Sequence, residues 1–422
     1  MVVAQLAETW LAARQGTAAL AGWAILLPFS LLMQQMSTGA MGGGVVSAVA
    51  RALGAQRRDE AAALVQHALI IAVVAGLAFA LGVSFLARPM IGAIAGPASA
   101  DAATGYAVFL FGVGAIPTWL ANTYASVLRG GGRHALAARV LALTWVVYPI
   151  LAWVLAEPAG MGLAGVGASF AAVSWVASGV MAIVVKQGGA GFIPTLRVRP
   201  SRHLFVRILS VGAIACAMSA VANLTTILVT AQLRSYGTEV VAAYGIAARL
   251  EFLVIPLSFG VGSALTALVG GAVGGGDWHT ARRTAWLGGA LAFAVTGSIG
   301  IIVAWASVPF AMLFTRDAAV ADIAARALTF TGPAFGGFGL GMAMYFASMG
   351  AGRMAWPVAG ALSRFVFAVG GGWWLATIAN MGMNGYFLGV ALGITSYGLV
   401  TASGVRGGTW SERAGLVRTP LQ

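Results

Sequence analysis

Long apolar stretches recur along the chain, and short clusters of Gly, Pro and charged residues separate them. A helix needs about 20 residues to cross the apolar core of a bilayer. Stretches such as 61–86 and 285–308 reach that length and are apolar around most of the helix. The pattern predicts spans at 18–50, 61–86, 104–128, 136–155 and 161–186, then at 205–233, 238–272, 284–308, 326–350, 355–378 and 384–403.

The two halves of the chain repeat one plan. Identical residues recur at a constant offset of 221, where Thr9, Gly16, Leu32 and Gly39 match Thr230, Gly237, Leu253 and Gly260. At an offset of 220, Gly132, Arg133, Gly162 and Gly165 match Gly352, Arg353, Gly382 and Gly385. Six helices per half return the chain to its starting side, which is typical of parallel repeats related by an axis along the membrane normal. We therefore predict an all-α polytopic membrane protein of 12 helices in two six-helix bundles.

The repeat also sets the expected domain limits. Met1 corresponds to Ala222, inside the seventh helix, so the first helix is expected to lack about its first 15 to 20 residues. A start assigned too late or a shortened chain would explain this. The predicted parts are an N-terminal lobe over 1–186, a cytoplasmic linker over 187–204, a C-terminal lobe over 205–406 and a cytoplasmic tail over 407–422.

Composition supports the membrane interpretation. Hydrophobic residues make up 60% of the chain and charged residues only 8%, against about 25% charged in soluble domains. The net charge of +13 comes from short basic clusters between spans, so we expect no nucleic-acid partner. When loops are assigned alternately to the two sides, 17 of the 24 Lys and Arg residues share one side. The positive-inside rule then places both termini in the cytoplasm, in a multi-pass protein of the cell inner (plasma) membrane, which we expect to be a monomer.

Two carboxylates lie inside predicted spans, where a charge costs roughly 2.5 to 3.5 kcal/mol on insertion scales. Glu8 lies about 12 Å along the helix from the loop at Gly16, and burial favours its protonated form. A carboxyl group that exchanges between its two forms suits a cation-coupling site. The alternatives are a structural hydrogen bond or an effect of the short first helix.

The second intramembrane carboxylate, Glu251, lies two residues after Arg249 and nearly opposite it on the helix. The two side chains therefore cannot simply neutralise each other, and each is expected to face a cavity or a partner on another helix. The repeat maps them to Pro28 and Ser30, so the two halves differ chemically. Glu251 fits either a role in transport or a structural ion pair.

Other polar residues within spans are less specific. Gln34, Asn122, Asn223 and Thr226 could line a pathway, although such residues more often join helices through ordinary hydrogen bonds. His67 is expected to be a packed histidine, because no carboxylate or second histidine is spaced to complete a metal site. We also find no Ser/His, paired Asp or metal-ligand constellation on adjacent spans, so we predict neither a metal site nor an enzyme.

Several short motifs resemble bacterial members of the multidrug and toxic compound extrusion (MATE) family. The segments AETWL at 7–11 and GTAALAG at 16–22 are similar to the end of the first helix in that family. The segments VARALGA at 49–55, LRG at 128–130 and AAYGIA at 242–247 add to the likeness. Together with the doubled plan, the resemblance covers essentially the whole chain.

The resemblance implies a role for Glu8, because many members carry an acidic residue in the N-terminal lobe that is implicated in cation coupling. Their fifth helix often adds an Asn and, four residues later, an Asp, but the matching positions here are Thr144 and Tyr148. Either one carboxyl therefore suffices, with Tyr148 donating a hydrogen bond, or coupling has moved towards Glu251. A site with one acid and few oxygen ligands favours protons over sodium, with no cofactor.

The combined expectation is secondary active efflux by alternating access, in which an amphipathic or cationic organic compound is exchanged for protons. Trp23, Tyr244 and Arg249 are candidates to line the substrate cavity, together with the polar residues above. A flippase for lipid-linked saccharides is the first alternative, although only Arg249 and Arg364 are obvious cations for a phosphate-binding cavity. The second is a membrane receptor or scaffold that does not transport.

Overall fold

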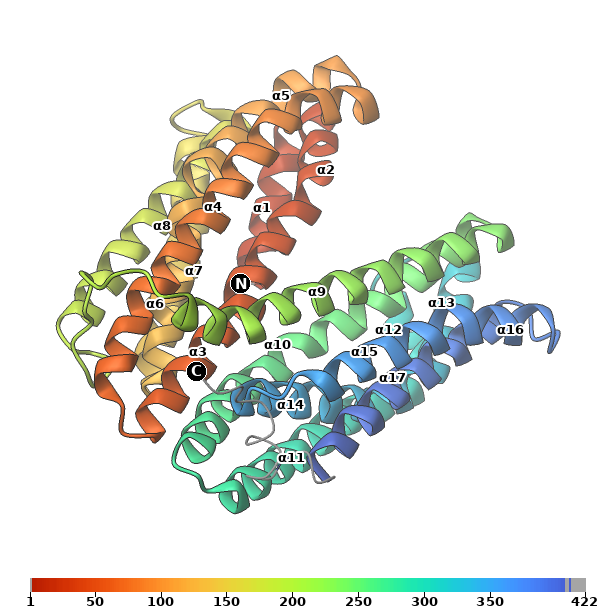
Figure 1. Cartoon of the computed structure of the whole chain (residues 1–422). Helices are drawn as coiled ribbons and strands as arrows, with labels where there is room; N and C mark the ends of the chain where they lie inside the picture. The colour runs from red at the N-terminus through yellow and green to blue at the C-terminus, as the bar shows by residue number, and fades with distance from the viewer. Residues whose placement is uncertain (1, 407–409, 411–422) are drawn as a thin grey trace. The chain divides into compact units, whose positions relative to one another are not determined.

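The computed structural model describes residues 2–406 and 410, and at 2, 3, 252–254, 256 and 257 only the backbone. Its described part is helical and contains no β-strand (Figure 1). Eight described helices are long and apolar enough to cross a membrane, or nine if Pro97–Val113 and Ala115–Gly130, bent by 42°, form one span. The predicted all-α polytopic membrane protein is thus confirmed. The expected tail lies outside the described residues, apart from Trp410.

The first half contains six helical segments, several of them interrupted. They are α1 (Val2–Arg14); α2 (Thr17–Gln34), the π-helical Gln35–Ala40 and α3 (Met41–Gly54); α4 (Arg58–Ala95); α5 (Pro97–Ala107), the π-helical Val108–Val113 and α6 (Ala115–Gly130); α7 (His134–Ala156); and α8 (Gly162–Lys186). Each interruption lies within a segment rather than between two, so the predicted spans keep their order.

The second half repeats this arrangement. Its segments are α9 (Arg202–Leu233) with the 3-10 turn Arg234–Tyr236; α10 (Thr238–Gly274); α11 (Trp278–Trp305) and the short α12 (Ser307–Met312); α13 (Ala318–Thr331), Gly332–Ala334 and α14 (Phe335–Ala351); α15 (Ala355–Phe365), the π-helical Val366–Gly371 and α16 (Gly372–Thr377); and α17 (Met383–Arg406). The layout agrees with two sets of six helical segments.

The backbone turns between helices also obey the repeat. Gly16 and Gly237, which precede α2 and α10, have φ angles of 100° and 112°. Gly162 and Gly382, at the starts of the sixth and twelfth segments, have φ angles of 56° and 57°. These values lie in a region that residues with a Cβ rarely adopt, so the matched glycines mark equivalent turns.

The chain forms two compact units, residues 1–53 with 57–212 and residues 54–56 with 213–422, and each is described by itself. In each unit the buried residues are mostly Ala, Val, Leu and aromatic side chains. Many large apolar side chains point outwards, such as Phe85, which is 75% exposed, and Trp305, which is 88% exposed. Outward apolar side chains at this density fit a lipid surface better than water.

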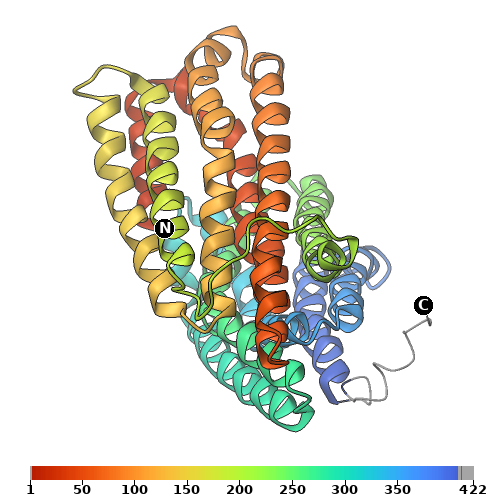
Figure 2. The same ribbon diagram turned by 60° about the vertical axis from the view of Figure 1, so that its left-hand side comes forward.

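An irregular segment over residues 187–201 leads from α8 to α9 and is held against α4 (Figure 2). Gln66 donates a 3.0 Å hydrogen bond to the Val198 carbonyl and accepts one of 2.8 Å from the Val198 amide. His67 is fully buried and accepts a 2.9 Å hydrogen bond from the Ser201 amide through Nε2. His67 thus lies at a packed interface, where it satisfies a backbone group of the connecting segment.

Candidate functional site

A polar cluster in the first unit surrounds Glu8, a side chain on α1 that is only 9% exposed. Trp23 on α2 donates a 3.1 Å hydrogen bond from Nε1 to Glu8 Oε1. Tyr106 on α5 donates from its hydroxyl to the same oxygen. Tyr148 on α7 is 2% exposed, and its hydroxyl lies close enough to interact with the charge of Glu8. Three helices therefore bring aromatic side chains to the carboxyl group on α1, and two of these side chains, Trp23 and Tyr106, donate hydrogen bonds to it.

The helix turns explain why these residues meet at one depth. Glu8 and Trp23 lie before and after the turn at Gly16, Tyr106 follows the turn at Gly96, and Tyr148 precedes the one at Glu157. Each is about 10 to 15 Å along its helix from that turn, at 1.5 Å per residue. An ion pair joins the first and last of these turns, since Arg14 Nε lies 3.1 Å from Glu157 Oε1.

The ion pair at the end of the lobe lies outside the spans and sets the charge state of its carboxyl group. Arg14 donates two hydrogen bonds to Glu157, and Gln15 donates a third. The Arg14 guanidinium thereby holds the pKa of Glu157 below its ordinary value of 4.5. Glu157 stays charged at neutral pH beside the turns that position Glu8 and Trp23.

A close contact between α2 and α5 also supports the cluster. A Cβ at Gly22 would lie 2.4 Å from the Ala103 Cβ and 2.8 Å from the Ser99 carbonyl oxygen. Only a residue without a side chain lets the two helices approach this closely. Trp23 follows Gly22, and Tyr106 lies one helical turn after Ala103. The contact therefore helps to place both donors beside Glu8.

The other two coupling residues predicted in this unit, Thr144 and Tyr148, do not donate a hydrogen bond to Glu8 as Trp23 and Tyr106 do. The Thr144 hydroxyl donates to the Val140 carbonyl of its own helix at 2.9 Å, so it is not bonded to Glu8. The Tyr148 hydroxyl is buried and has no hydrogen-bond partner among the described residues. Tyr106 was missed in the sequence. The only available signal was that a tyrosine within an apolar span needs a partner for its hydroxyl.

The second unit contains a pair of opposite charges within its helices. Glu251 on α10 forms an ion pair with Arg364 on α15, and each side chain is 13% exposed. Arg364 Nη2 donates to Glu251 Oε1 at 2.5 Å. Tyr244, which is 5% exposed, lies close enough to interact with both charges. Removing one partner of such a buried pair typically costs about 3 to 5 kcal/mol, because the other charge is left uncompensated.

The remaining cavity candidates are held mostly by local bonds. Asn122 donates to the Ser37 hydroxyl at 2.9 Å, which joins α6 to the π-helical segment after Gln34. Asn223 and Thr226 donate to carbonyls of their own helix. Arg249 is exposed on α10 and belongs to no described ion pair. Their contribution to a substrate cavity stays a prediction.

Metal ligation finds no support in the part of the chain that the structure describes, where no group of three or more His, Cys, Asp or Glu side chains could hold an ion.

A family model described as MatE matches residues 1–154 and 213–374. No curated protein matches the chain.

Solved structures match nearly the whole chain. An outward-facing multidrug resistance MATE family transporter of the MOP superfamily is 22% identical, covers 99% of this chain and 93% of its own, and gives a TM-score of 0.87. A Vibrio cholerae MATE transporter in its bent form is 20% identical over 97% and 94% of the two chains, with a TM-score of 0.88. A MOP superfamily transporter from Pyrococcus furiosus, said to have a binding pocket of reverse polarity, is 20% identical over 96% and 93%, with a TM-score of 0.88. At these identities the likeness establishes the fold alone.

Proposed function

The chain belongs to the MatE family of multidrug and toxic compound extrusion transporters, and from that premise we propose that it exports an amphipathic organic compound in exchange for protons. Glu8 carries the proton in this proposal. Trp23 and Tyr106 hold its carboxyl group, and Tyr148 stands beside it. The protein works in the cell inner membrane with both termini in the cytoplasm.

One observation carries the proposal: both hydrogen bonds to Glu8 reach the same oxygen, Oε1. Neither of these two bonds reaches Oε2. When the group is charged, two donors stabilise it, and charge-assisted bonds are stronger than neutral ones. When it is protonated, Oε2 takes the proton while Oε1 keeps both donors. The cluster therefore accommodates both forms without rearranging the helices.

The donors around Glu8 favour a proton over a metal cation. Hard cations are bound by several oxygen ligands, whereas Trp23 offers an N–H that donates only. Thr144, which could supply an oxygen, is already bonded to Val140. A proton needs a single basic oxygen, and the Glu8 carboxylate supplies one.

One carboxyl group is energetically sufficient for export. A single charge crossing 100 mV gains about 2.3 kcal/mol, and each 1.4 kcal/mol corresponds to a tenfold ratio. One proton per cycle can thus sustain roughly a 40-fold concentration gradient of a compound with no net charge. The absence of a second acid at Tyr148 does not prevent coupling on this scale.

Dye efflux from proteoliposomes tests the proposal. Proton and sodium gradients are imposed separately on the full chain, on Glu8→Gln and on Asp101→Asn, which neutralises an exposed acid near the same end of the lobe. We expect efflux to follow the proton gradient, to fall at least about tenfold in Glu8→Gln, in line with the loss of a charge-assisted interaction, and to persist in Asp101→Asn. Proton-driven efflux that survives Glu8→Gln would contradict the assignment.

The two alternative functions, a flippase and a receptor or scaffold, predict other results in the dye-efflux assay. A flippase for lipid-linked saccharides would move such lipids and no dye, but one of its two candidate cations, Arg364, is already paired with Glu251. A receptor or scaffold would show no gradient-driven flux and no dependence on Glu8. Flux of no dye under either gradient would favour these two alternatives over export.

A further inference from the structure

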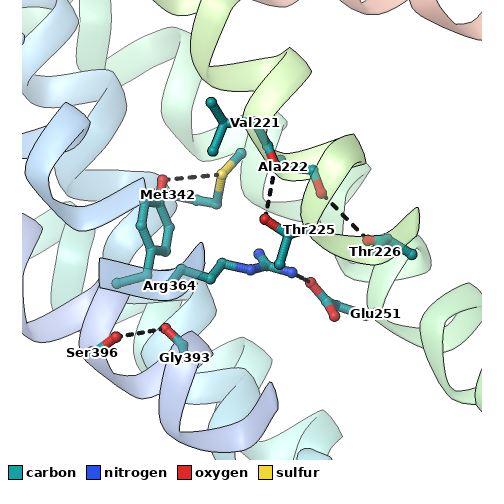
Figure 3. Close-up of polar contacts among 10 residues, drawn as sticks. Val221, Ala222, Thr225, Thr226, Glu251, Met342, Arg364, Gly393 and Ser396 are labelled. Carbon is teal, nitrogen blue, oxygen red and sulfur yellow. Dashed lines mark hydrogen bonds and ion pairs between the residues drawn. The ribbon is translucent and has the colours of Figure 1, made fainter. Parts of the chain in front are cut away.

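The ion pair of the second unit is held by a single hydrogen bond (Figure 3). Arg364 Nη2 donates to Glu251 Oε1. In a bidentate pair, by contrast, two guanidinium nitrogens would each donate to one of the two carboxylate oxygens. Among the described residues, Glu251 Oε2 and the other guanidinium nitrogens make no hydrogen bond. Each of the two side chains is 13% exposed. The pair therefore has hydrogen-bonding atoms that its own contact does not use.

Aromatic and neutral side chains surround the two charges. The Arg364 guanidinium carbon lies 5.6 Å from the centre of the Phe338 ring, and Phe338 packs against Tyr397 at 6.4 Å. Thr225 lies beside the pair in Figure 3, but its hydroxyl donates to the Val221 carbonyl of its own helix at 2.8 Å. No described ion pair brings a third charge to these two residues. Charge balance at this place thus depends on Glu251 and Arg364 alone.

The need to keep both charges compensated determines which kind of ligand could separate Glu251 from Arg364. A cation that took Glu251 would leave Arg364 uncompensated among apolar helices, and an anion that took Arg364 would leave Glu251 uncompensated. Either outcome is strongly unfavourable for a buried pair. A ligand with one positive and one negative group can contact both side chains and leave neither unpaired.

We propose that Glu251 and Arg364 form a charge-selective site for zwitterionic organic compounds, with the cationic group on Glu251 and the anionic group on Arg364. The site determines specificity and takes no part in carrying the proton. The inference rests on the proposed transport of organic compounds. It narrows the substrate class from cations in general to compounds that bear both charges.

Binding of three dyes with a common xanthene skeleton tests the site by fluorescence anisotropy on the full chain in detergent. Rhodamine B carries both charges, its ethyl ester carries only the cation, and fluorescein carries only negative charge. We expect rhodamine B to bind at least about tenfold more tightly than the other two. Glu251→Gln should shift the preference towards fluorescein, and Arg364→Gln towards the ester, each by about tenfold.

The double variant Glu251→Gln with Arg364→Gln leaves no unpaired charge and protects the test against misfolding of a single variant. It should bind the three dyes with dissociation constants within about threefold of one another. Asp322→Asn, which breaks an exposed ion pair with Arg326 on α13, is the matched control and should keep the original order. Unchanged ratios between the dyes in the double variant would overturn the proposal and leave the pair a purely structural one.

The binding assay needs no gradient, so it separates this site from proton coupling. In one outcome, rhodamine B binds more tightly than the other two dyes while proton-driven efflux survives Glu8→Gln. That result would refute the coupling role of Glu8 and support the site. The reverse result, in which efflux depends on Glu8 but the dyes show no charge order, would refute the site and leave the coupling proposal intact.

Discussion

At the scale of single residues, Glu8 is stabilised by neutral donors rather than by a basic partner. Trp23 and Tyr106 both donate to Oε1, and the first unit places no described Lys or Arg in an ion pair with it. A basic partner would hold the carboxylate in its charged form. Neutral donors stabilise it less, so the proton can both bind and leave during a cycle.

The two tyrosines near Glu8 should therefore differ in their effects. Tyr106→Phe removes a hydrogen bond to the carboxylate while keeping the ring, a loss of about 1.5 to 3 kcal/mol for a bond to a charged group. We expect proton-driven dye efflux to fall about tenfold or more in this variant. Tyr148→Phe removes a hydroxyl with no described partner and should reduce efflux less.

Thermal unfolding midpoints of the two tyrosine variants separate coupling from stability. Both side chains are fully buried aromatic groups, so similar midpoints with unequal efflux would attribute the difference to the bond with Glu8. Equal efflux in Tyr106→Phe and in the parent protein would contradict the proposed role of Tyr106.

At the scale of helices, the placement of the donors depends on how closely α2 and α5 pack. Gly22 has no room for a Cβ against Ala103 and Ser99. Gly82 on α4 also lies within a helix, but a Cβ there would meet nothing within 4 Å. The two positions therefore share a residue type and a helical backbone, and differ in packing.

Gly22→Ala should lower both stability and coupling. Overpacking at a tight helix contact typically costs about 1 to 3 kcal/mol, and separating α2 from α5 moves Trp23 relative to Tyr106. We expect a lower thermal midpoint and weaker proton-driven efflux. Gly82→Ala, the matched control, should keep its efflux and keep or raise its thermal midpoint, because alanine in an open helical position is favoured over glycine by roughly 1 kcal/mol. Equal midpoints in the two variants would refute the packing argument.

At the scale of the whole molecule, two units built on one plan carry different chemistry. Gly16 and Gly237 turn the chain in the same way, yet the first unit holds a carboxyl group among neutral donors and the second an ion pair. Glu251 and Arg249 occupy the places of Ser30 and Pro28 in the repeat. The division suits a transporter in which one lobe carries the proton and the other recognises the compound.

Membrane orientation gives a prediction at this scale. The positive-inside rule predicts that the segment 187–201 lies in the cytoplasm and that the turn after Glu157 lies outside. In a Cys216→Ala background, which removes the only cysteine, we expect Ala159→Cys to react with a membrane-impermeant maleimide in intact cells. Gln187→Cys should react only after permeabilisation. Labelling of both, or the reverse order, would contradict the predicted topology.

The sequence by itself determined the helices and their doubled plan, because hydropathy and repeated turn residues are local properties that each segment carries. It also marked Glu8 and Glu251, since a carboxylate within an apolar span stands out without any tertiary information. Only the tertiary structure decided their partners. Tyr106 lies 98 residues from Glu8 and Arg364 lies 113 residues from Glu251. Which side chain meets a carboxyl group depends on how each helix is rotated and how closely it packs, and glycine contacts such as that at Gly22 set this packing.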